Sequence, residues 1–208
     1  MSLLLATTAV VVAFFFGSIP FGYIIGRVFY GMDIRTKGSG NIGAANALRT
    51  MGKAGAIGVL LFDALKGFIP VVLCKALGAE PAVIAVVAAA AVLGHCFSPW
   101  LGWHGGKGVA TSIGAIIGLS WPAGLVCIGG WVAGAAITAF SSVGSIVLNL
   151  AAPIALWYLT REPAYAAYGA FAALLIIYTH RENIARIRAG HENAIGLFRP
   201  WRRPNEGN

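Results

Sequence analysis

Charged residues are scarce in this 208-residue chain, where they make up 11% of the sequence. A soluble domain carries about 25%, so the scarcity argues against a water-soluble fold. Acidic residues are scarcer than basic ones, with seven Asp and Glu against 15 Lys and Arg. Together with 58% hydrophobic residues and a mean hydropathy of +0.79, this composition predicts an integral membrane protein with long apolar segments.

Cysteine pairs and a cleavable leader are also missing. The three cysteines, Cys74, Cys96 and Cys127, stand alone in apolar sequence and form no disulfide framework, so we expect small buried hydrophobes. No Lys or Arg precedes the first apolar stretch, and no clear small-residue cleavage site follows it. A signal peptide needs both features, so this stretch is expected to stay as the first membrane helix.

The apolar stretches predict an all-α bundle of seven membrane helices, since a spanning helix needs about 20 apolar residues. The expected ranges are 3–29, 54–77, 82–98, 109–120, 122–139, 144–159 and 164–184. A break at Trp121-Pro122 is favoured because proline is tolerated in a first helical turn, and a count of five helices is the alternative. We expect one domain over residues 1–198 and a short basic tail over 199–208.

Basic residues fall mainly on one side of this topology. With the N-terminus outside, only Lys75 and Arg161 lie outside, Lys66 lies within a helix, and every other Lys and Arg lies inside. Lys and Arg collect on the cytoplasmic side of membrane proteins, so the sequence predicts an outside N-terminus and a cytoplasmic C-terminus. Topology therefore explains the net charge of +8, and no nucleic-acid partner is expected.

The polar segment 36–49 fits the GxGxxG pattern through Gly38, Gly40 and Gly43. A dinucleotide-binding turn also needs a preceding strand, a following helix and an acidic residue about 20 positions on. Asp63 stands at that distance, but no βαβ unit can be built between a membrane helix and a basic loop. A nucleotide-binding role is therefore rejected.

The same glycines can direct several backbone N–H groups at one anion. Ser39, Asn41 and Asn46 would add side-chain donors, and Arg49 a planar guanidinium suited to phosphate. The segment is interpreted as an anion-binding loop. The alternative is a flexible cytoplasmic loop whose positive charges only set the topology.

The segment 94–110, GHCFSPWLGWHGGKGVA, places a lysine among glycines at the start of an expected helix. These residues are Gly105, Gly106, Lys107 and Gly108. A helix N-terminus with free N–H groups binds anions, and Lys107 would add a point charge; the alternative is a glycine turn with a topology lysine. His95 and His104 are nine residues apart without acidic neighbours, so no metal site is expected.

In the third polar segment, 180–196, His180 and Asn183 are three residues apart and are expected to share a helix face. Gly190 marks a helix end, and Glu192 follows it. A histidine at a helix end is more often a cap than a catalyst, and both interpretations stay open. Asp63 and Lys66, three residues apart within the second helix, are either a structural ion pair or part of the site.

These three segments all fall on the predicted inner side, as do Ser142 and Ser145. Two anion-binding loops beside a His/Asn pair predict one site for a phosphate-bearing substrate. A transporter or channel for an anionic phosphate compound would use the same groups. It should also show inverted repeats and helices broken at mid-membrane, and the sequence contains no internal repeat.

The segments GSGNIGAANALR, GHCFSPWLGWHGGKGVA and HRENIARIRAGHEN closely resemble the three signature segments of the bacterial acyl-phosphate:glycerol-3-phosphate acyltransferase family, often called PlsY. The resemblance runs from about residue 17 to Gly196, with the segments in the family's order and spacing. Two departures are mild: Ala45 and His191 stand where threonine is common. Neither removes a charged or amide group.

The resemblance implies transfer of an acyl group from acyl phosphate to the 1-hydroxyl of sn-glycerol 3-phosphate, giving lysophosphatidic acid and phosphate. It implies a seven-span bundle in the bacterial inner membrane, with the site facing the cytoplasm and with no metal or other cofactor. The implied partners are the two substrates, the lipid bilayer and, as an open question, the soluble enzyme that makes acyl phosphate. Acyl-CoA remains the nearest alternative donor.

Roles for the residues follow as hypotheses. Ser39, Asn41 and Arg49 bind one phosphate, with Gly38, Gly40, Gly43 and Asn46 shaping their loop. Lys107 and the amides of Gly105, Gly106 and Gly108 bind the other. Ser142 or Ser145 lines the pocket, and Glu192 orients a neighbouring donor. His180 and Asn183 hold glycerol 3-phosphate, and either His180 or a substrate phosphate takes the hydroxyl proton.

Overall fold

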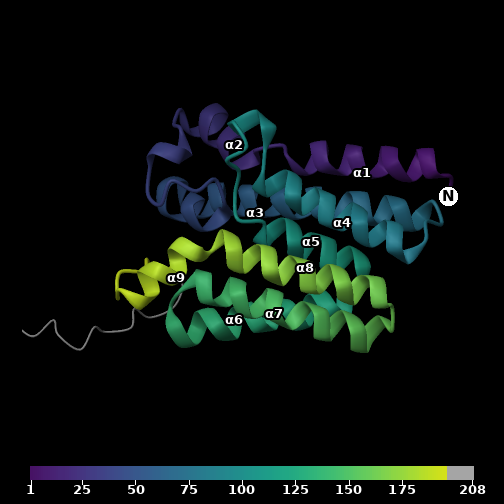
Figure 1. Ribbon diagram of the computed structural model, residues 1–208. Coiled ribbons are helices and arrows are strands. Elements are labelled where there is room, and N and C mark those ends of the chain that lie inside the picture. The colour runs from purple at the N-terminus through teal and green to yellow at the C-terminus, as the bar shows by residue number, and fades with distance from the viewer. Residues whose placement is uncertain (196–208) are drawn as a thin grey trace, which may run out of the picture.

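The computed structural model describes residues 1–195, and this part of the chain is all-helical (Figure 1). Its elements are α1 (Leu3–Gly17), α2 (Phe21–Tyr30), η1 (Ile34–Thr36), α3 (Ala44–Ala76), α4 (Pro81–Cys96), η2 (Pro99–Leu101), α5 (Val109–Leu119), α6 (Trp121–Thr138), α7 (Ser141–Thr160), α8 (Pro163–Thr179) and α9 (Arg181–Arg188). The predicted boundary at residue 198 and the basic tail 199–208 lie outside the described residues.

Five helical segments are long and apolar enough to cross a membrane. They are Leu3–Tyr30, Ala44–Ala76, Pro81–Leu101, Trp121–Thr138 and Ser141–Thr160. Two shorter apolar helices, α5 and α8, pack among them. The predicted class, an all-helical integral membrane protein, is confirmed. Seven membrane helices were predicted and five segments are long enough to span; the other two predicted helices correspond to the shorter helices α5 and α8.

Two predicted helix boundaries are wrong at the N-terminal end. The expected helix 3–29 divides into α1 and α2 because Pro20 has no N–H to donate and disfavours helical backbone at the residue before it. The expected helix 54–77 begins ten residues earlier, at Ala44. Gly52 interrupts α3 with φ 72° and ψ −168°, a conformation that only glycine adopts readily. The last residues of the segment 36–49 are therefore helical.

The expected helix 164–184 is also divided, into α8 and α9, at His180. The Thr179 hydroxyl donates to the carbonyls of Lys107 and Ile176, at 3.0 and 3.1 Å. The His180 backbone leaves helical geometry at φ −97° and ψ 8°. His180 and Asn183 therefore do not share one continuous helix, contrary to the prediction.

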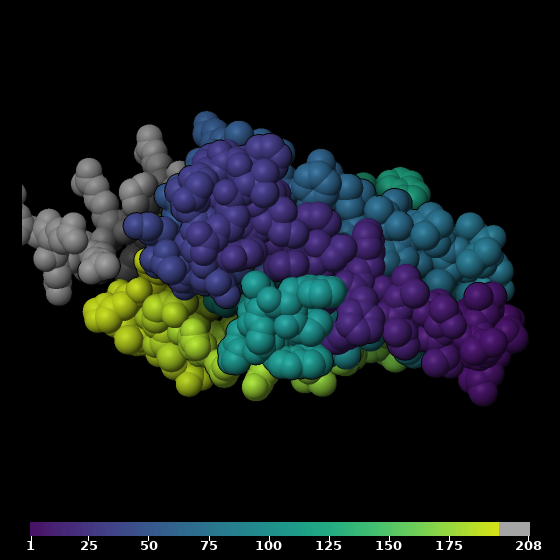
Figure 2. Space-filling model, turned by 90° about the horizontal axis from the view of Figure 1, so that it is seen from above, coloured from purple at the N-terminus to yellow at the C-terminus, as the bar shows by residue number. Residues whose placement is uncertain are grey.

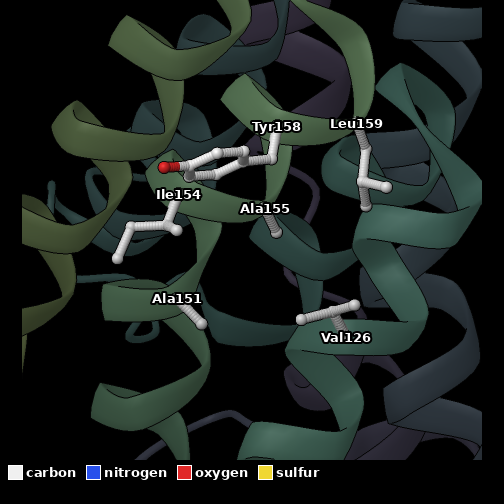
Figure 3. A pocket seen from close by; sticks show the side chains of 6 residues that line it. All are labelled: Val126, Ala151, Ile154, Ala155, Tyr158 and Leu159. Carbon is white, nitrogen blue, oxygen red and sulfur yellow. The ribbon is translucent and has the colours of Figure 1, made fainter.

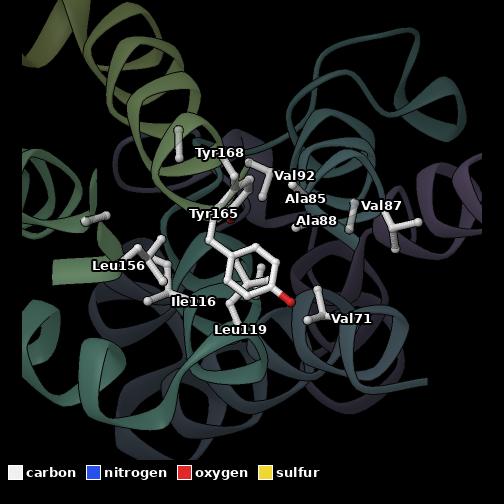
Figure 4. Packing of buried hydrophobic residues seen from close by; sticks show 14 of the residues in the cluster. Val71, Ala85, Val87, Ala88, Val92, Ile116, Leu119, Leu156, Tyr165 and Tyr168 are labelled. Atoms are coloured by element: carbon white, nitrogen blue, oxygen red, sulfur yellow. The ribbon is translucent and has the colours of Figure 1, made fainter. Parts of the chain in front are cut away.

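The core lies between α3, α4, α5, α7 and α8 (Figure 4). Tyr165 and Tyr168 of α8 point into a cluster that includes Val71, Val87, Val92, Ile116, Leu119 and Leu156. In lipid, helices associate mainly through close packing of small residues. A Cβ at Gly67 would overlap the Thr111 carbonyl, and one at Gly114 would overlap the Ala64 carbonyl. This close contact between α3 and α5 fixes the first turns of α5, which begins two residues after Lys107.

The two ends of the bundle differ in charge. The chain begins at one end, and α3 and α7 finish at that same end, with Lys75 in the last turn of α3 and Arg161 directly after α7 (Figure 1). The loop around η1 and helix α9 lie at the opposite end. The basic residues of the polar segments are therefore gathered at one end of the fold.

Candidate active site

The three polar segments lie near one another toward the end of the bundle that carries α9. Figure 1 places the residues between α2 and α3 and helix α9 at this end, and Figure 2 shows the η2 loop beside both of them. Their sequence separation is large, but α3, α5 and α8 each bring one segment there. The predicted gathering of these segments at one side of the protein is seen in the structure.

The loop before α3 is organised by a single buried amide. The Asn46 side chain, 1% exposed, donates to the carbonyls of Ile34, Lys37 and Asn41 at 3.2, 3.1 and 2.8 Å. Its oxygen accepts the Ser39 N–H at 2.8 Å. Both N–H donors of the amide are engaged inside the loop, so Asn46 shapes the loop and has no free donor for a substrate.

Half of the backbone N–H groups in the glycine loop 38–43, those of Ser39, Gly40 and Gly43, already have partners. Gly40 donates to the Lys37 carbonyl at 3.0 Å, and Gly43 donates to the Asn41 side chain at 2.8 Å. Gly38 and Gly40 take positive φ, 58° and 73°, as the tight turn requires. The Ser39 hydroxyl has no hydrogen bond to the described residues, and Ser39 is exposed.

The glycines before Lys107 differ from the prediction. The N–H groups of Gly105 and Gly106 donate to the carbonyls of Cys96 and His95, both at 3.0 Å. They are therefore unavailable to a phosphate, and their role is close packing against the end of α4. Within the described part of the chain, no group accepts from the N–H groups of Gly108, Val109 and Ala110, which open α5.

A hydrogen-bonded network joins the second and third segments around Glu192, whose side chain is 4% exposed. The Lys107 ammonium donates to the Asn183 oxygen. The Asn183 amide donates to Glu192 Oε1 at 2.6 Å, and the Ser142 hydroxyl donates to the same oxygen at 2.9 Å. Arg186 Nε donates to Glu192 Oε2 at 2.9 Å. Lys107, Asn183, Ser142 and Glu192, four residues predicted for the site, therefore lie together.

Arg186 belongs to this network and was not predicted as a site residue. Gly190, at φ 72°, ends α9 with a pair of reverse-turn hydrogen bonds: its N–H donates to the Ile187 carbonyl and the His191 N–H to that of Arg186. This is the Schellman arrangement, and it returns the chain so that Glu192 reaches Arg186. The helix-ending glycine in the sequence was the signal that could have identified the pair.

Arg49 ties the first segment to the third. Its guanidinium donates to the carbonyls of Asn193 and Ala194 at 3.3 and 3.4 Å. The Ile195 N–H donates to the Ala139 carbonyl at 2.9 Å. Residues 192–195 therefore run across the site from α9 to the junction of α6 and α7.

His180 is buried at the junction of α8 and α9, 3% exposed. Burial and the nearby Lys107 charge lower the pKa of its imidazole to about 4, so the ring is neutral near pH 7. Its Nδ1 lies 2.8 Å from the Ile176 carbonyl. A neutral ring donates Nδ1–H there and keeps Nε2 as an acceptor.

The electrostatics of the network favour an anionic ligand. Burial lowers the pKa of the Lys107 ammonium, and the positive charge of Arg186 lowers it further, while Glu192 opposes the shift. Lys107, Arg49 and Arg186 thus lie near Glu192, and Glu182 is a second carboxylate that acts on Lys107. Among residues 1–195, no three His, Cys, Asp or Glu side chains are grouped so that they could hold a metal ion.

Some predicted residues do not join this network. Ser145 is one of them, and it donates to the Ser141 carbonyl of its own helix at 2.8 Å.

Two surface grooves are apolar and include no residue of the network. One is lined by Val126 of α6 and by Ala151, Ile154, Ala155, Tyr158 and Leu159 of α7 (Figure 3). The other is lined by Ile19, Pro20, Tyr23, Ile24, Trp100 and Leu101.

The fold and the network define an all-helical integral membrane protein of several spans, with buried polar side chains gathered at one end. The chain belongs to the glycerol-3-phosphate acyltransferase family, whose model matches residues 7–190. The resemblance of the three motifs is thereby confirmed.

Similar proteins cover nearly the whole chain. A glycerol-3-phosphate acyltransferase from Synechococcus sp. (strain JA-3-3Ab) is 44% identical over 92% of this chain and 94% of its own. One from Bradyrhizobium sp. (strain BTAi1 / ATCC BAA-1182) is 46% identical over 90% and 94%. The crystal structure of PlsY (YgiH), an integral membrane glycerol 3-phosphate acyltransferase, in its glycerol 3-phosphate form is 35% identical, with a TM-score of 0.86 over 91% of this chain and 94% of that one. Its lysophosphatidic acid form has a TM-score of 0.85.

Proposed function

We propose that this protein transfers the acyl group of an acyl phosphate to the 1-hydroxyl of sn-glycerol 3-phosphate. The products are lysophosphatidic acid and inorganic phosphate. The observation that carries the proposal is the network of Lys107, Asn183 and Glu192, which joins two family motifs in a positively charged site. Family membership, and the glycerol 3-phosphate and lysophosphatidic acid forms of the similar structure, support the choice of acceptor and product.

The reaction exchanges one carbon–oxygen bond for another. The glycerol 1-oxygen attacks the acyl carbonyl carbon, and the bond from that carbon to the phosphate oxygen breaks. The hydroxyl proton leaves with the phosphate. Acyl phosphate is already an activated mixed anhydride, so positioning and oriented positive charge can lower the barrier without a covalent enzyme intermediate.

Charge stabilisation is assigned to Lys107 and to the start of α5. The N–H groups of Gly108, Val109 and Ala110 and the Lys107 ammonium are placed to hold the departing phosphate. Arg49 and Ser39 are assigned to the phosphate of the acceptor. Gly105 and Gly106 support Lys107 through the end of α4 and do not bind phosphate themselves.

Asn183 is assigned to positioning, because both ends of its amide are engaged by Lys107 and Glu192. His180 is assigned to the acceptor hydroxyl through Nε2. With a pKa of about 4, it is a weaker base than a phosphate monoester, whose second pKa is about 6. We therefore assign the proton to a substrate phosphate oxygen.

Purified protein in lipid should turn over labelled glycerol 3-phosphate with acyl phosphate and should keep its activity in EDTA, because lysine, arginine and backbone amides supply the charge. Acyl-CoA at the same concentration is the matched control donor. Efficient turnover with acyl-CoA alone would overturn the donor assignment. Loss of activity in EDTA that Mg²⁺ or Zn²⁺ restores would overturn the metal-free site.

The proposed topology has seven spans in a bacterial plasma membrane, with the N-terminus outside and the site facing the cytoplasm. It adds α5 and α8 to the five long apolar segments and puts the basic end inside. Single cysteines at residues 38–43, in a variant without the three native cysteines, should react with an impermeant maleimide only when the cytoplasmic face is accessible. Cysteines at residues 78–80 are the control for the outer face. Labelling of 38–43 in intact cells would contradict this orientation.

A further inference from the structure

A second group of buried ionisable side chains lies behind the turn that carries Lys107. It consists of Asp63 and Lys66 of α3 and His95 of α4, each at most 3% exposed. Lys66 Nζ lies 2.8 Å from Asp63 Oδ1, and His95 Nδ1 lies 3.7 Å from the same oxygen. Lys66 also donates to the Ile19 carbonyl at 2.8 Å. A buried ion pair is often no more stabilising than apolar side chains of similar size, so stability alone does not explain this cluster.

His95 connects the cluster to the turn. Its carbonyl accepts the Gly106 N–H at 3.0 Å, and the next carbonyl, that of Cys96, accepts the Gly105 N–H at the same distance. The imidazole lies so close to Gly106 that a Cβ there would overlap its Nε2. The ring and the backbone of His95 thus contact the residue that directly precedes Lys107.

We propose that Asp63, Lys66 and His95 are positioning residues for Lys107. Asp63, paired with Lys66, faces the imidazole of His95 across 3.7 Å and acts on its orientation through charge and not through a direct hydrogen bond. The imidazole and the His95 carbonyl then fix Gly106, which sets where the Lys107 ammonium points. The catalytic part of this inference rests on the proposed function, because a misplacement of about 1 Å in an active site can cost about 10²-fold in rate. The structural part does not depend on the reaction.

A double-variant set tests the contact between His95 and Gly106. Gly106→Ala is expected to lower kcat by about 10²-fold, because its Cβ displaces either the imidazole or the turn. In a His95→Ala background the imidazole is gone, so adding Gly106→Ala should cost at most about twofold more. If the loss of kcat in the double variant equals the product of the losses in the two single variants, Gly106 does not make room for this ring and the inference is overturned. Each variant is compared as intact, monodisperse protein.

Asp63→Asn tests the carboxylate, since it removes the charge and keeps the shape. It should lower kcat by about tenfold in the native background and have no further effect in Lys107→Ala. Lys75→Met is the matched control, because Lys75 also ties α3 to α5, donating to the Gly118 and Leu119 carbonyls at 3.1 and 3.0 Å. It lies at the opposite end of the bundle and should lower thermal stability without changing kcat.

Hydrogen exchange of the peptide covering residues 104–110 supplies a measurement that needs no substrate. Asp63→Asn should speed exchange at Gly105 and Gly106, whereas Lys75→Met should not. An inactive wild-type protein would refute the proposed function and leave this exchange result standing. An active wild-type protein with unchanged exchange and unchanged kcat in Asp63→Asn would refute the positioning role.

Discussion

Lys107→Ala is expected to lower kcat by at least about 10²-fold in folded, membrane-inserted protein. The Lys107 ammonium is held against Asn183 beside the N–H groups that open α5, which have no acceptor within residues 1–195. Charge on the leaving phosphate grows as its bond to the acyl carbon breaks, so an interaction with it strengthens in the transition state. The loss should therefore fall more on kcat than on KM, measured with each substrate varied in turn.

Lys107→Arg should recover only part of the activity, because a planar guanidinium does not replace a compact ammonium at the Asn183 contact. Lys53→Ala is the matched control, since it removes an exposed lysine of α3 and changes the net charge equally. Near-normal kcat in well-folded Lys107→Ala would reduce this lysine to a determinant of topology.

Glu192→Ala is also expected to have a large effect, a loss of about 10²-fold in kcat/KM. The Glu192 carboxylate accepts from Asn183, Ser142 and Arg186. Its removal leaves a buried amide and a guanidinium without their partner, which costs more than one hydrogen bond. Asn183 then no longer holds Lys107 in place. Steady-state kinetics together with thermal unfolding in the same detergent measure both consequences.

Two milder changes separate the parts of this network. Glu192→Gln keeps an acceptor for one neighbour but turns an NH₂ group toward another donor, so we expect an intermediate loss. Ser142→Ala removes only one of the three hydrogen bonds, which corresponds to about fivefold at about 1 kcal/mol. Equal losses for Ser142→Ala and Glu192→Ala would contradict a network centred on the carboxylate.

Apolar runs predicted most of the helices, because length and hydropathy follow directly from the width of a bilayer. The expected ranges for α4, α5 and α6 agree with the structure to within two residues. The errors fall where local geometry overrides an apolar run. Pro20 ends α1, and the Thr179 contact with the Lys107 carbonyl accompanies the break before α9. The second of these is a tertiary contact that one sequence does not reveal.

The composition of the site was easier to predict than the contacts within it. The helix-start lysine, the spacing of Asn183 from His180 and the resemblance of the three motifs together identified Lys107, Asn183 and Glu192 as candidates, and the fold brings them together. The sequence did not show that the Asn46 amide donates to three carbonyls of its own loop, or that the Gly106 N–H donates to the His95 carbonyl. These hydrogen-bond partners depend on tertiary packing. The roles of Lys107, Asn183 and Glu192 in the reaction are proposals, which the variants above test.

The most direct test of the proposed reaction is its stoichiometry in purified wild-type protein reconstituted in lipid. Acyl phosphate and radiolabelled sn-glycerol 3-phosphate are supplied without acyl-CoA. We expect one labelled 1-acylglycerol 3-phosphate for each phosphate released, with both products nearly absent in Lys107→Ala. Release of phosphate without labelled lipid, or labelled lipid formed equally well by Lys107→Ala, would contradict the proposed reaction.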